Sequence, residues 1–402
     1  MTDSIETAAG YRENLSEREK LWLKYLDSER RSKDRIEEDS TQLLKFGGVS
    51  MKYGMQIIGT PDENGLYPLY IALHGGGSDE TGEINEDQWR QMSRYYLGEV
   101  KNGVYVNPRA VRNTWDCHSN PESFPLYDRL IENMIIFRCV DPNRVYLLGF
   151  SAGGDGVYQI SPRMADRFAA VNMSAGHPNG IKLDNLYNTP IQLQVGINDV
   201  SYNRNTETAR YGIKLDDLNE KYGGGYEHRV NIHLDRAHNF ADYDSEEHLI
   251  VEDPAEYYRT GEFKGVKSKT GAVSFLDAHV RDPLPETVVW NLAVRADQRD
   301  VESFYWLSAP KTTTKGVVKA VFSRETNSVT IDTDGRLNGD LSILLSTEMF
   351  DFDSKITVIK DGISYEITPQ IRKEVMEETL VERGDPSYIF EDRISLSQLT
   401  DG

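Results

Sequence analysis

The chain has 402 residues, with 45 lysines and arginines against 65 aspartates and glutamates, and a formal net charge of −20. This acidic balance argues against nucleic acid or an anionic membrane as a partner and favours a neutral or cationic substrate. The two cysteines, Cys117 and Cys139, form neither a disulfide framework nor a metal-ligand cluster, so we expect no metal and no other cofactor.

No stretch of the chain approaches the roughly 20 apolar residues that a membrane helix needs. Residues 1–10 lack the basic start and the apolar core of a signal peptide. We therefore expect a cytoplasmic protein without membrane contact. A leader that had already been removed would leave no trace in this sequence.

The first predicted element is a charged helix. Ser16 followed by Glu19 is a capping-box pattern, which predicts a helix that runs to about Leu44. We expect residues 1–45 to form an N-terminal helical segment that packs on the rest of the chain or on a second subunit. Residues 51–58 then alternate between two faces, which predicts an early strand of a sheet.

The next predicted strand, residues 67–73, ends in His74-Gly75-Gly76-Gly77. Consecutive glycines let the backbone approach a ligand closely and turn its N–H groups inward. Inward N–H groups are the usual stabilisers of the oxyanion in serine acyl transfer. We therefore assign Gly76 and Gly77 as oxyanion donors, the alternative being an ordinary flexible loop.

A polar and aromatic loop, residues 113–118, follows a predicted strand at residues 103–106. It should overhang the same edge of the sheet as residues 74–77, and functional residues are often found on such loops. We take His74, Trp115 and His118 as candidates for a substrate pocket. The alternative is a buried tryptophan that anchors the loop beside a hydrogen-bonded histidine.

The most informative motif comes after a helix predicted near residues 126–138. The apolar run 144–148 leads directly into Gly149-Phe150-Ser151-Ala152-Gly153. A G-x-S-x-G motif between a strand and a helix predicts a nucleophile elbow, in which small residues permit a sharp turn and the serine projects above the sheet. Ser151 is the predicted nucleophile, and the N–H of Ala152 is a third oxyanion donor. A glycine-rich turn at a helix N-terminus is the alternative.

A serine nucleophile needs a base, and the base needs an acid behind it. Asp199 follows the apolar strand 191–195, and His238 follows the strand 230–234, which we expect to be the last of the sheet. The order Ser151, Asp199, His238 is that of the α/β-hydrolase triad. Asp235 and Asp242 remain alternatives for the acid.

Strands and helices alternate through this part of the chain, which predicts a mostly parallel sheet with helices on both faces. Its ligand site should lie beyond the carboxyl ends of the strands. Asp155, His177 and Arg204 are weaker site candidates, and Arg204 could either meet a substrate carboxylate or form a surface salt bridge. We place the catalytic domain at residues 46–284.

Beyond about Pro285 the pattern changes to short β-type runs separated by turn signals such as Asp334-Gly335. Residues 285–402 are expected to form an accessory β-rich domain, most economically a small sandwich. Such a module could bind a glycan, restrict the cleft, cover apolar surface or mediate oligomerisation.

These motifs together resemble the serine esterases of the α/β-hydrolase fold, in the branch of carboxylesterases, feruloyl esterases and polyhydroxybutyrate depolymerases. The resemblance extends from about Leu69 to Phe240 and implies hydrolysis of a small-molecule ester through an acyl-serine, in a protein that could form a homo-oligomer. A serine peptidase with the same triad and a catalytically inactive binding protein are the alternatives.

Overall fold

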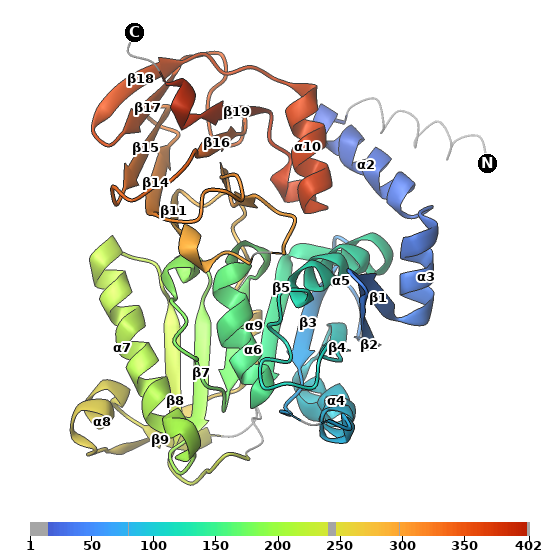
Figure 1. Cartoon of the computed structure of the whole chain (residues 1–402), viewed down its shortest axis with the longest axis vertical. Helices are drawn as coiled ribbons and strands as arrows, with labels where there is room; N and C mark the ends of the chain where they lie inside the picture. The colour runs from blue at the N-terminus through green and yellow to red at the C-terminus, as the bar shows by residue number, and fades with distance from the viewer. Residues whose placement is uncertain (1–14, 79, 240–246, 297, 400–402) are drawn as a thin grey trace.

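The computed structural model describes residues 15–78, 80–239, 247–296 and 298–399. Within these residues ten strands form one large sheet, in the order β1-β2-β4-β3-β5-β6-β7-β8-β9-β10 (Figure 1). The strands are β1 (Leu43–Phe46), β2 (Val49–Ile58), β3 (Tyr67–Leu73), β4 (Gly103–Pro108), β5 (Val140–Phe150), β6 (Ala170–Ser174), β7 (Ile191–Gly196), β8 (His228–His233), β9 (Glu247–Val251) and β10 (Gly265–Lys269).

The centre of the sheet is parallel and its two margins are antiparallel. Strands β4, β3, β5, β6, β7 and β8 pair in parallel, whereas β1 and β2 on one side and β9 and β10 on the other pair antiparallel. The expected mostly parallel sheet is confirmed. The expectation that residues 230–234 are its last strand is wrong, because β9 turns back onto β8 and β10 extends the sheet further.

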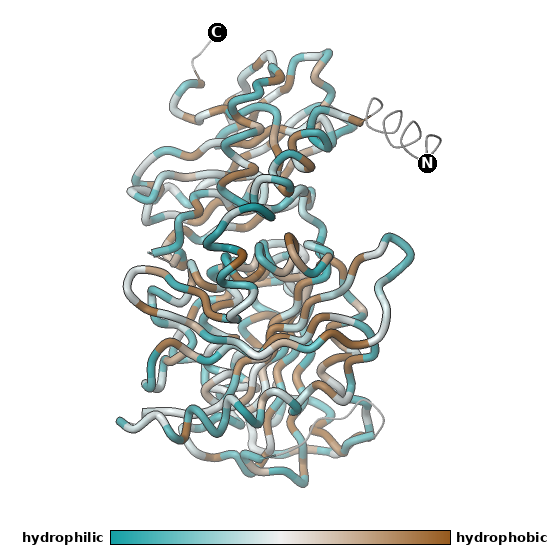
Figure 2. The backbone as a smooth tube through the Cα atoms, turned by 90° about the vertical axis from the view of Figure 1, so that its right-hand side faces the viewer, coloured by the Kyte–Doolittle hydropathy of each residue, from teal (hydrophilic) through white to brown (hydrophobic). Residues whose placement is uncertain are grey.

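Helices cover both faces because the inner strands are apolar on both sides. In β3, Leu69, Ile71 and Leu73 belong to one buried cluster, which also contains side chains of α5 (Ser123–Arg138), α6 (Ala152–Ile160) and α7 (Arg204–Tyr222). The intervening Tyr70 and Ala72 face the opposite cluster, with α4 (Glu83–Tyr95) and α9 (Ala272–Asp277). This alternation has the period of a strand. The hydrophobic segments accordingly gather inside the layered body (Figure 2). A short helix, α8 (Pro254–Thr260), lies between β9 and β10.

The N-terminal segment contains two helices rather than the single long one expected. The predicted capping box opens α2 (Glu17–Glu29), where Ser16 and Glu19 exchange hydrogen bonds. Ser32 then caps a separate helix, α3 (Lys33–Thr41), because its hydroxyl accepts the Arg35 N–H. The chain passes next into β1, so the predicted boundary at residue 45 falls within a strand of the large sheet.

The C-terminal part is built from two smaller sheets. One has the order β11-β14-β15-β17-β18 and the other β12-β13-β16-β19. Ring contacts between Trp306 and Phe322 and between Trp290 and Phe304 join them. A helix that the sequence analysis did not predict, α10 (Lys373–Arg383), packs beside α2 (Figure 1). The strands are β11 (Thr287–Asn291), β12 (Ser303–Phe304), β13 (Leu307–Ser308), β14 (Val317–Ser323), β15 (Ser328–Thr333), β16 (Ser342–Leu345), β17 (Ile356–Lys360), β18 (Ile363–Ile367) and β19 (Asp392–Ser395).

The two parts share one hydrophobic core and meet at the amino ends of the parallel strands. Arg281 donates to the carbonyls of Asn143, near the start of β5, and of Asp166, just before β6, and its guanidinium also donates to Asp385 of the C-terminal part. Buried ion pairs cross the same boundary, among them Arg299 with Asp128 and Arg383 with Asp166. The C-terminal part therefore lies at the end of the sheet opposite to the carboxyl ends of the strands. The predicted division at 45 and 284 into separate domains stays a prediction.

Candidate active site

Ser151 occupies a strained turn between β5 and α6. Its backbone has φ 57° and ψ −121°, a region that L-residues rarely adopt. The flanking glycines permit this turn: a Cβ at Gly149 would lie 2.3 Å from the carbonyl oxygen of Gly153, and a Cβ at Gly153 would lie 2.1 Å from that of Leu73. The sequence motif thus encodes a close contact between the turn and the end of β3.

Three polar side chains meet above the sheet at this turn. Ser151 Oγ lies 2.9 Å from His238 Nε2, and His238 Nδ1 lies 2.7 Å from Asp199 Oδ2. An ionised Asp199 accepts the Nδ1–H, which leaves Nε2 free to accept the serine proton. Asp199 is 2% exposed, so its carboxylate is shielded from water.

The loops that carry Asp199 and His238 are held together by their backbones. They follow the paired parallel strands β7 and β8 and leave the sheet at the same edge. The Asn198 N–H donates to the Arg236 carbonyl, and a Cβ at Gly196 would lie 2.3 Å from the Ala237 carbonyl oxygen. The two loops can therefore hardly shift independently.

Of the two alternative acids, the structure describes only Asp235. Asp235 has a 59% exposed side chain and pairs with Arg236. Asp242 is outside the described residues. Ser174, the last residue of β6, is fully buried and accepts a hydrogen bond from Asn172.

The glycine loop passes directly beside Ser151. A Cβ on Gly75 would lie 3.3 Å from the Ser151 Cβ, and Gly76 has φ 143°, which favours glycine. Ala152 is the first residue of α6, so its N–H has no acceptor within the helix. The Gly77 N–H donates to Asn85 Oδ1 at 3.3 Å, so it is engaged within the protein. The Gly77 N–H is therefore less available to a ligand than the N–H of Ala152.

Two of the three pocket candidates are buried behind this loop instead of facing a cavity. His74 is fully buried, with Nδ1 2.5 Å from the Gly75 carbonyl and Nε2 accepting the Ala110 N–H. His118 Nε2 lies 2.9 Å from the His74 carbonyl. Burial lowers the pKa of His118 to about 4. Burial and the neighbouring His118 ring together hold the pKa of His74 well below its ordinary value. Both rings are neutral at pH 7 and support the loop.

The third candidate, Trp115, lines a cavity of about 700 Å³ that contains none of the three residues of the proposed triad but includes Arg204, which approaches Asp199. Its ring covers Gly77, where a Cβ would lie 2.6 Å away, and its side chain is largely exposed. Asp155, which also lines this cavity, lies one helical turn beyond Ser151 in α6. Burial raises the pKa of Asp155. The lining residues are Ser78, Thr114, Trp115, Asp116, Ser119, Asp155, Gln159, His177, Asn179, Tyr202 and Arg204. Sequence reasoning did not single out Tyr202, since no motif marks it.

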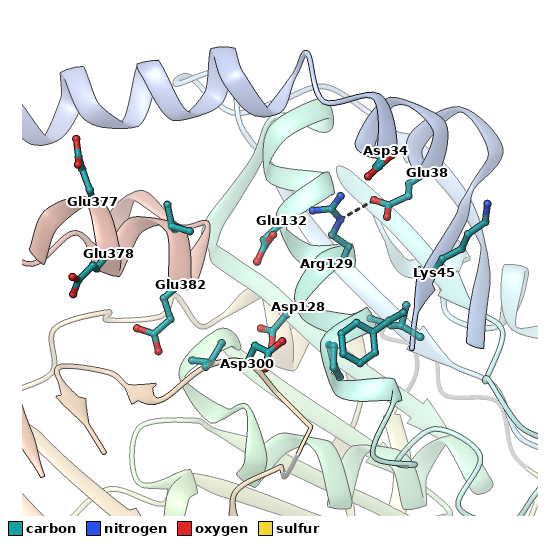
Figure 3. Close-up of a pocket in the computed structure, with 15 residues that line it drawn as sticks. Asp34, Glu38, Lys45, Asp128, Arg129, Glu132, Asp300, Glu377, Glu378 and Glu382 are labelled. Atoms are coloured by element: carbon teal, nitrogen blue, oxygen red, sulfur yellow. Dashed lines mark hydrogen bonds and ion pairs between the residues drawn. The ribbon is translucent and has the colours of Figure 1, made fainter. Parts of the chain in front are cut away.

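A larger cavity, of about 910 Å³, lies away from the triad, between α3, α5 and α10. Most of its polar lining is acidic, and Figure 3 shows Arg129 reaching from α5 to Glu38 on α3. Among the residues that the structure describes, no three histidine, cysteine, aspartate or glutamate side chains are grouped to hold a metal ion. In the same residues no helix combines the length and hydrophobicity of a membrane span.

Comparison with known proteins finds no matching family model. The chain is 26% identical over 147 residues, 35% of its length, to feruloyl esterase D of Neurospora crassa, of which this match covers 50%. It is 25% identical over 128 residues to a probable feruloyl esterase C of Aspergillus niger, covering 31% of this chain and 46% of that protein. A bifunctional acetylxylan esterase/xylanase of Neocallimastix patriciarum is 30% identical over 114 residues, or 28% of this chain and 16% of that one. The chain thus spans half or less of the length of these curated relatives.

One similar solved structure is a thermostable esterase, which is 20% identical to this chain with a TM-score of 0.38. The match covers 60% of this chain and 62% of that one. A second is LpqC, a poly(3-hydroxybutyrate) depolymerase from Bordetella parapertussis, with 14% identity, coverage of 54% and 86%, and a TM-score of 0.38.

Proposed function

We propose that this chain is a carboxylic ester hydrolase in which Ser151 is the nucleophile, His238 the general base and Asp199 the acid that orients the base. The observation that carries the proposal is the continuous series of hydrogen bonds from Ser151 Oγ through His238 to Asp199 at a strained strand-to-helix turn. The names of the curated relatives, feruloyl and acetylxylan esterases, agree with ester hydrolysis.

The proposed reaction has two halves. His238 Nε2 takes the hydroxyl proton of Ser151 as Oγ attacks the ester carbonyl carbon, and the resulting oxyanion accepts hydrogen bonds from the N–H groups of Gly76 and Ala152. Protonated His238 then gives its proton to the departing alcohol, which leaves an acyl-serine. Water, deprotonated by His238, attacks the acyl carbon and releases the acid with Ser151 restored.

The cavity that Trp115 and Tyr202 line suits a substrate with a ring. Trp115 and Tyr202, with side chains 57% and 66% exposed, offer flat apolar faces, while the remaining lining is polar. An aromatic acyl group or a sugar ring would find both a stacking surface and hydrogen-bond partners there. Esters of the kind that the relatives' names indicate are therefore reasonable first substrates.

A covalent probe tests the nucleophile. A fluorophosphonate should label Ser151, and the wild type should hydrolyse 4-nitrophenyl acetate or methyl ferulate faster than a matched 4-nitroanilide. Ser151→Ala should abolish both labelling and hydrolysis. Labelling that persists in Ser151→Ala would overturn the assignment, and a preference for the anilide would favour a peptidase.

A further inference from the structure

Arg204 is a buried cation that lines the same cavity as Trp115 and also approaches Asp199. It opens α7 directly after Tyr202 and Asn203, which both have left-handed backbones, with φ 58° and 56°. Arg204 is 7% exposed, yet it lines the cavity of about 700 Å³. It is therefore not the surface salt bridge that the sequence left as an alternative.

The guanidinium of Arg204 uses few of its hydrogen-bond donors. It has five N–H donors, but Nη1 makes only a 3.4 Å bond to the Ser201 carbonyl and approaches Asp199 Oδ1 to 3.6 Å. Nε is buried and has no hydrogen-bond partner among the described residues. The Tyr202 ring lies 5.0 Å from the guanidinium carbon and leaves the edge of the group available for in-plane bonds. Nη2 also makes no hydrogen bond among the described residues but, unlike Nε, is not closed off from the surface, so an acceptor in the cavity can pair with it.

The other charged groups of the cavity do not satisfy Arg204. The Asp155 carboxylate accepts the His177 N–H at 2.6 Å and the Asn179 side-chain amide at 3.3 Å. Asp116 and His177 complete the ionisable lining besides Tyr202. The net charge of −20 repels an anion at long range, but about 0.1 M salt screens that field beyond roughly 10 Å, whereas Arg204 acts on contact.

We propose that Arg204 binds a carboxylate of the substrate, so that the preferred substrates are esters that carry a second, free carboxylate. This inference rests on the proposed ester hydrolysis and names its substrate class. A guanidinium matches a carboxylate with two parallel hydrogen bonds, and a half-ester of a dicarboxylic acid would place its ester at Ser151 and its free end in the cavity. Water then cleaves the ester bond to give the dicarboxylate and the alcohol.

Matched substrates test this proposal. The 4-nitrophenyl monoester of glutaric acid should have a lower KM than the neutral 4-nitrophenyl valerate of equal chain length. A second pair, 4-carboxyphenyl butyrate against phenyl butyrate, places the carboxylate on the alcohol part instead. Free glutarate should inhibit the wild type competitively. A preference for the charged member of either pair, with this inhibition, supports the proposal and shows which half of the substrate reaches Arg204.

The variant Arg204→Gln should reduce the ratio of kcat/KM for the charged ester to that for the neutral one by roughly tenfold or more, mainly through KM. Arg204→Lys keeps the charge but loses the paired N–H donors of the guanidinium, so its ratio should lie between those of the wild type and Arg204→Gln. Arg210→Gln on the same helix is the matched control, because Arg210 pairs with Glu207 outside the cavity, and its ratio should equal that of the wild type. Each kcat is calculated per active site, with the number of active sites measured by fluorophosphonate titration.

The inference and the proposed function fail in different ways. Absence of labelling and of hydrolysis for every ester in the wild type would sink the proposed function. Wild-type cleavage of neutral esters without any preference for a charged one would overturn the Arg204 proposal alone. Equal losses on charged and neutral esters in Arg204→Gln would also overturn it, since they would indicate that Arg204 acts through Asp199.

Discussion

In the proposed triad, the carboxylate of Asp199 sets the tautomer of His238. Asp199→Asn keeps the shape but can present an N–H to Nδ1, which favours the tautomer that cannot accept the serine proton. We expect kcat on 4-nitrophenyl acetate to fall by about 10⁴, by analogy with serine proteases. Asp235→Asn is the control and should retain near wild-type kcat. The reverse pattern, an active Asp199→Asn beside an inactive Asp235→Asn, would move the acid to Asp235.

The buried histidines predict a loss of stability in mild acid. Burial lowers the pKa of His118 to about 4, below its ordinary 6.5, so between these values the unfolded chain binds a proton that the folded one does not. The free energy of unfolding should therefore fall as pH drops through this window, by about 1.4 kcal/mol per pH unit for such a histidine.

The urea midpoint measured at intervals from pH 7.5 to 4.5 checks this prediction. His118→Gln lacks the titrating ring and should show a shallower decline, even if it is less stable at pH 7. His228→Gln is a matched control, because His228 is only partly buried, near Asp216 at the edge of β8. A decline of equal slope in His118→Gln and the wild type would contradict the assignment.

At the scale of elements, the turn between β5 and α6 fixes the position of the nucleophile. Gly153→Ala would place a methyl group about 2.1 Å from the Leu73 carbonyl oxygen, so backbone must move. A displacement near 1 Å can cost about 10² in rate, and we expect kcat to fall by at least that factor. Gly98→Ala is the control, since a Cβ there meets nothing within 4 Å. Wild-type kcat in Gly153→Ala would mean that the turn is less constrained than its contacts indicate.

The sequence was most informative for the three residues of the proposed triad. Ser151, Asp199 and His238 each follow an apolar strand, so a local pattern located them, and the parallel pairing of β7 with β8 brought two of them together. The engagement of Gly77 by Asn85 depends on a residue eight positions away in another element, and no local pattern reports it.

Elements at the margins of the fold were harder to predict. Strands β9 and β10 are short and partly exposed, and their identity comes from pairing with β8 and with each other. Helix α10 carries little amphipathic pattern, because it packs between α2 and the C-terminal sheets on more than one side. The burial of His74 and His118 likewise depends on contacts between two loops that are far apart in the sequence.

At the scale of the whole molecule, buried charges bind the C-terminal part to the amino ends of the large sheet. Arg299 Nε lies 2.6 Å and Nη2 3.0 Å from the Asp128 carboxylate, and Arg383 pairs with Asp166. Burial opposes ionisation of Asp128, but the charges of Arg299 and Arg167 outweigh it and hold its pKa below the ordinary value. A chain cut near residue 284 would lose Arg299 and Arg383 and expose the shared core, so we expect it to be unstable for reasons unrelated to catalysis.

A single substitution separates this structural role from a catalytic one. Arg299→Met removes one of the two buried arginines that pair with Asp128, the other being Arg167, at little change in volume. Breaking a buried ion pair costs up to about 3 to 5 kcal/mol. The melting temperature should drop, while kcat per fluorophosphonate-titrated site stays at the wild-type value, because Asp128 lies at the opposite end of the strands from Ser151. Arg336→Gln, a surface arginine paired with Asp334, should change neither quantity. If Arg299→Met kept its melting temperature but lost kcat per titrated site, the C-terminal part would have to contribute to the active site, and its assignment as an accessory support would be wrong.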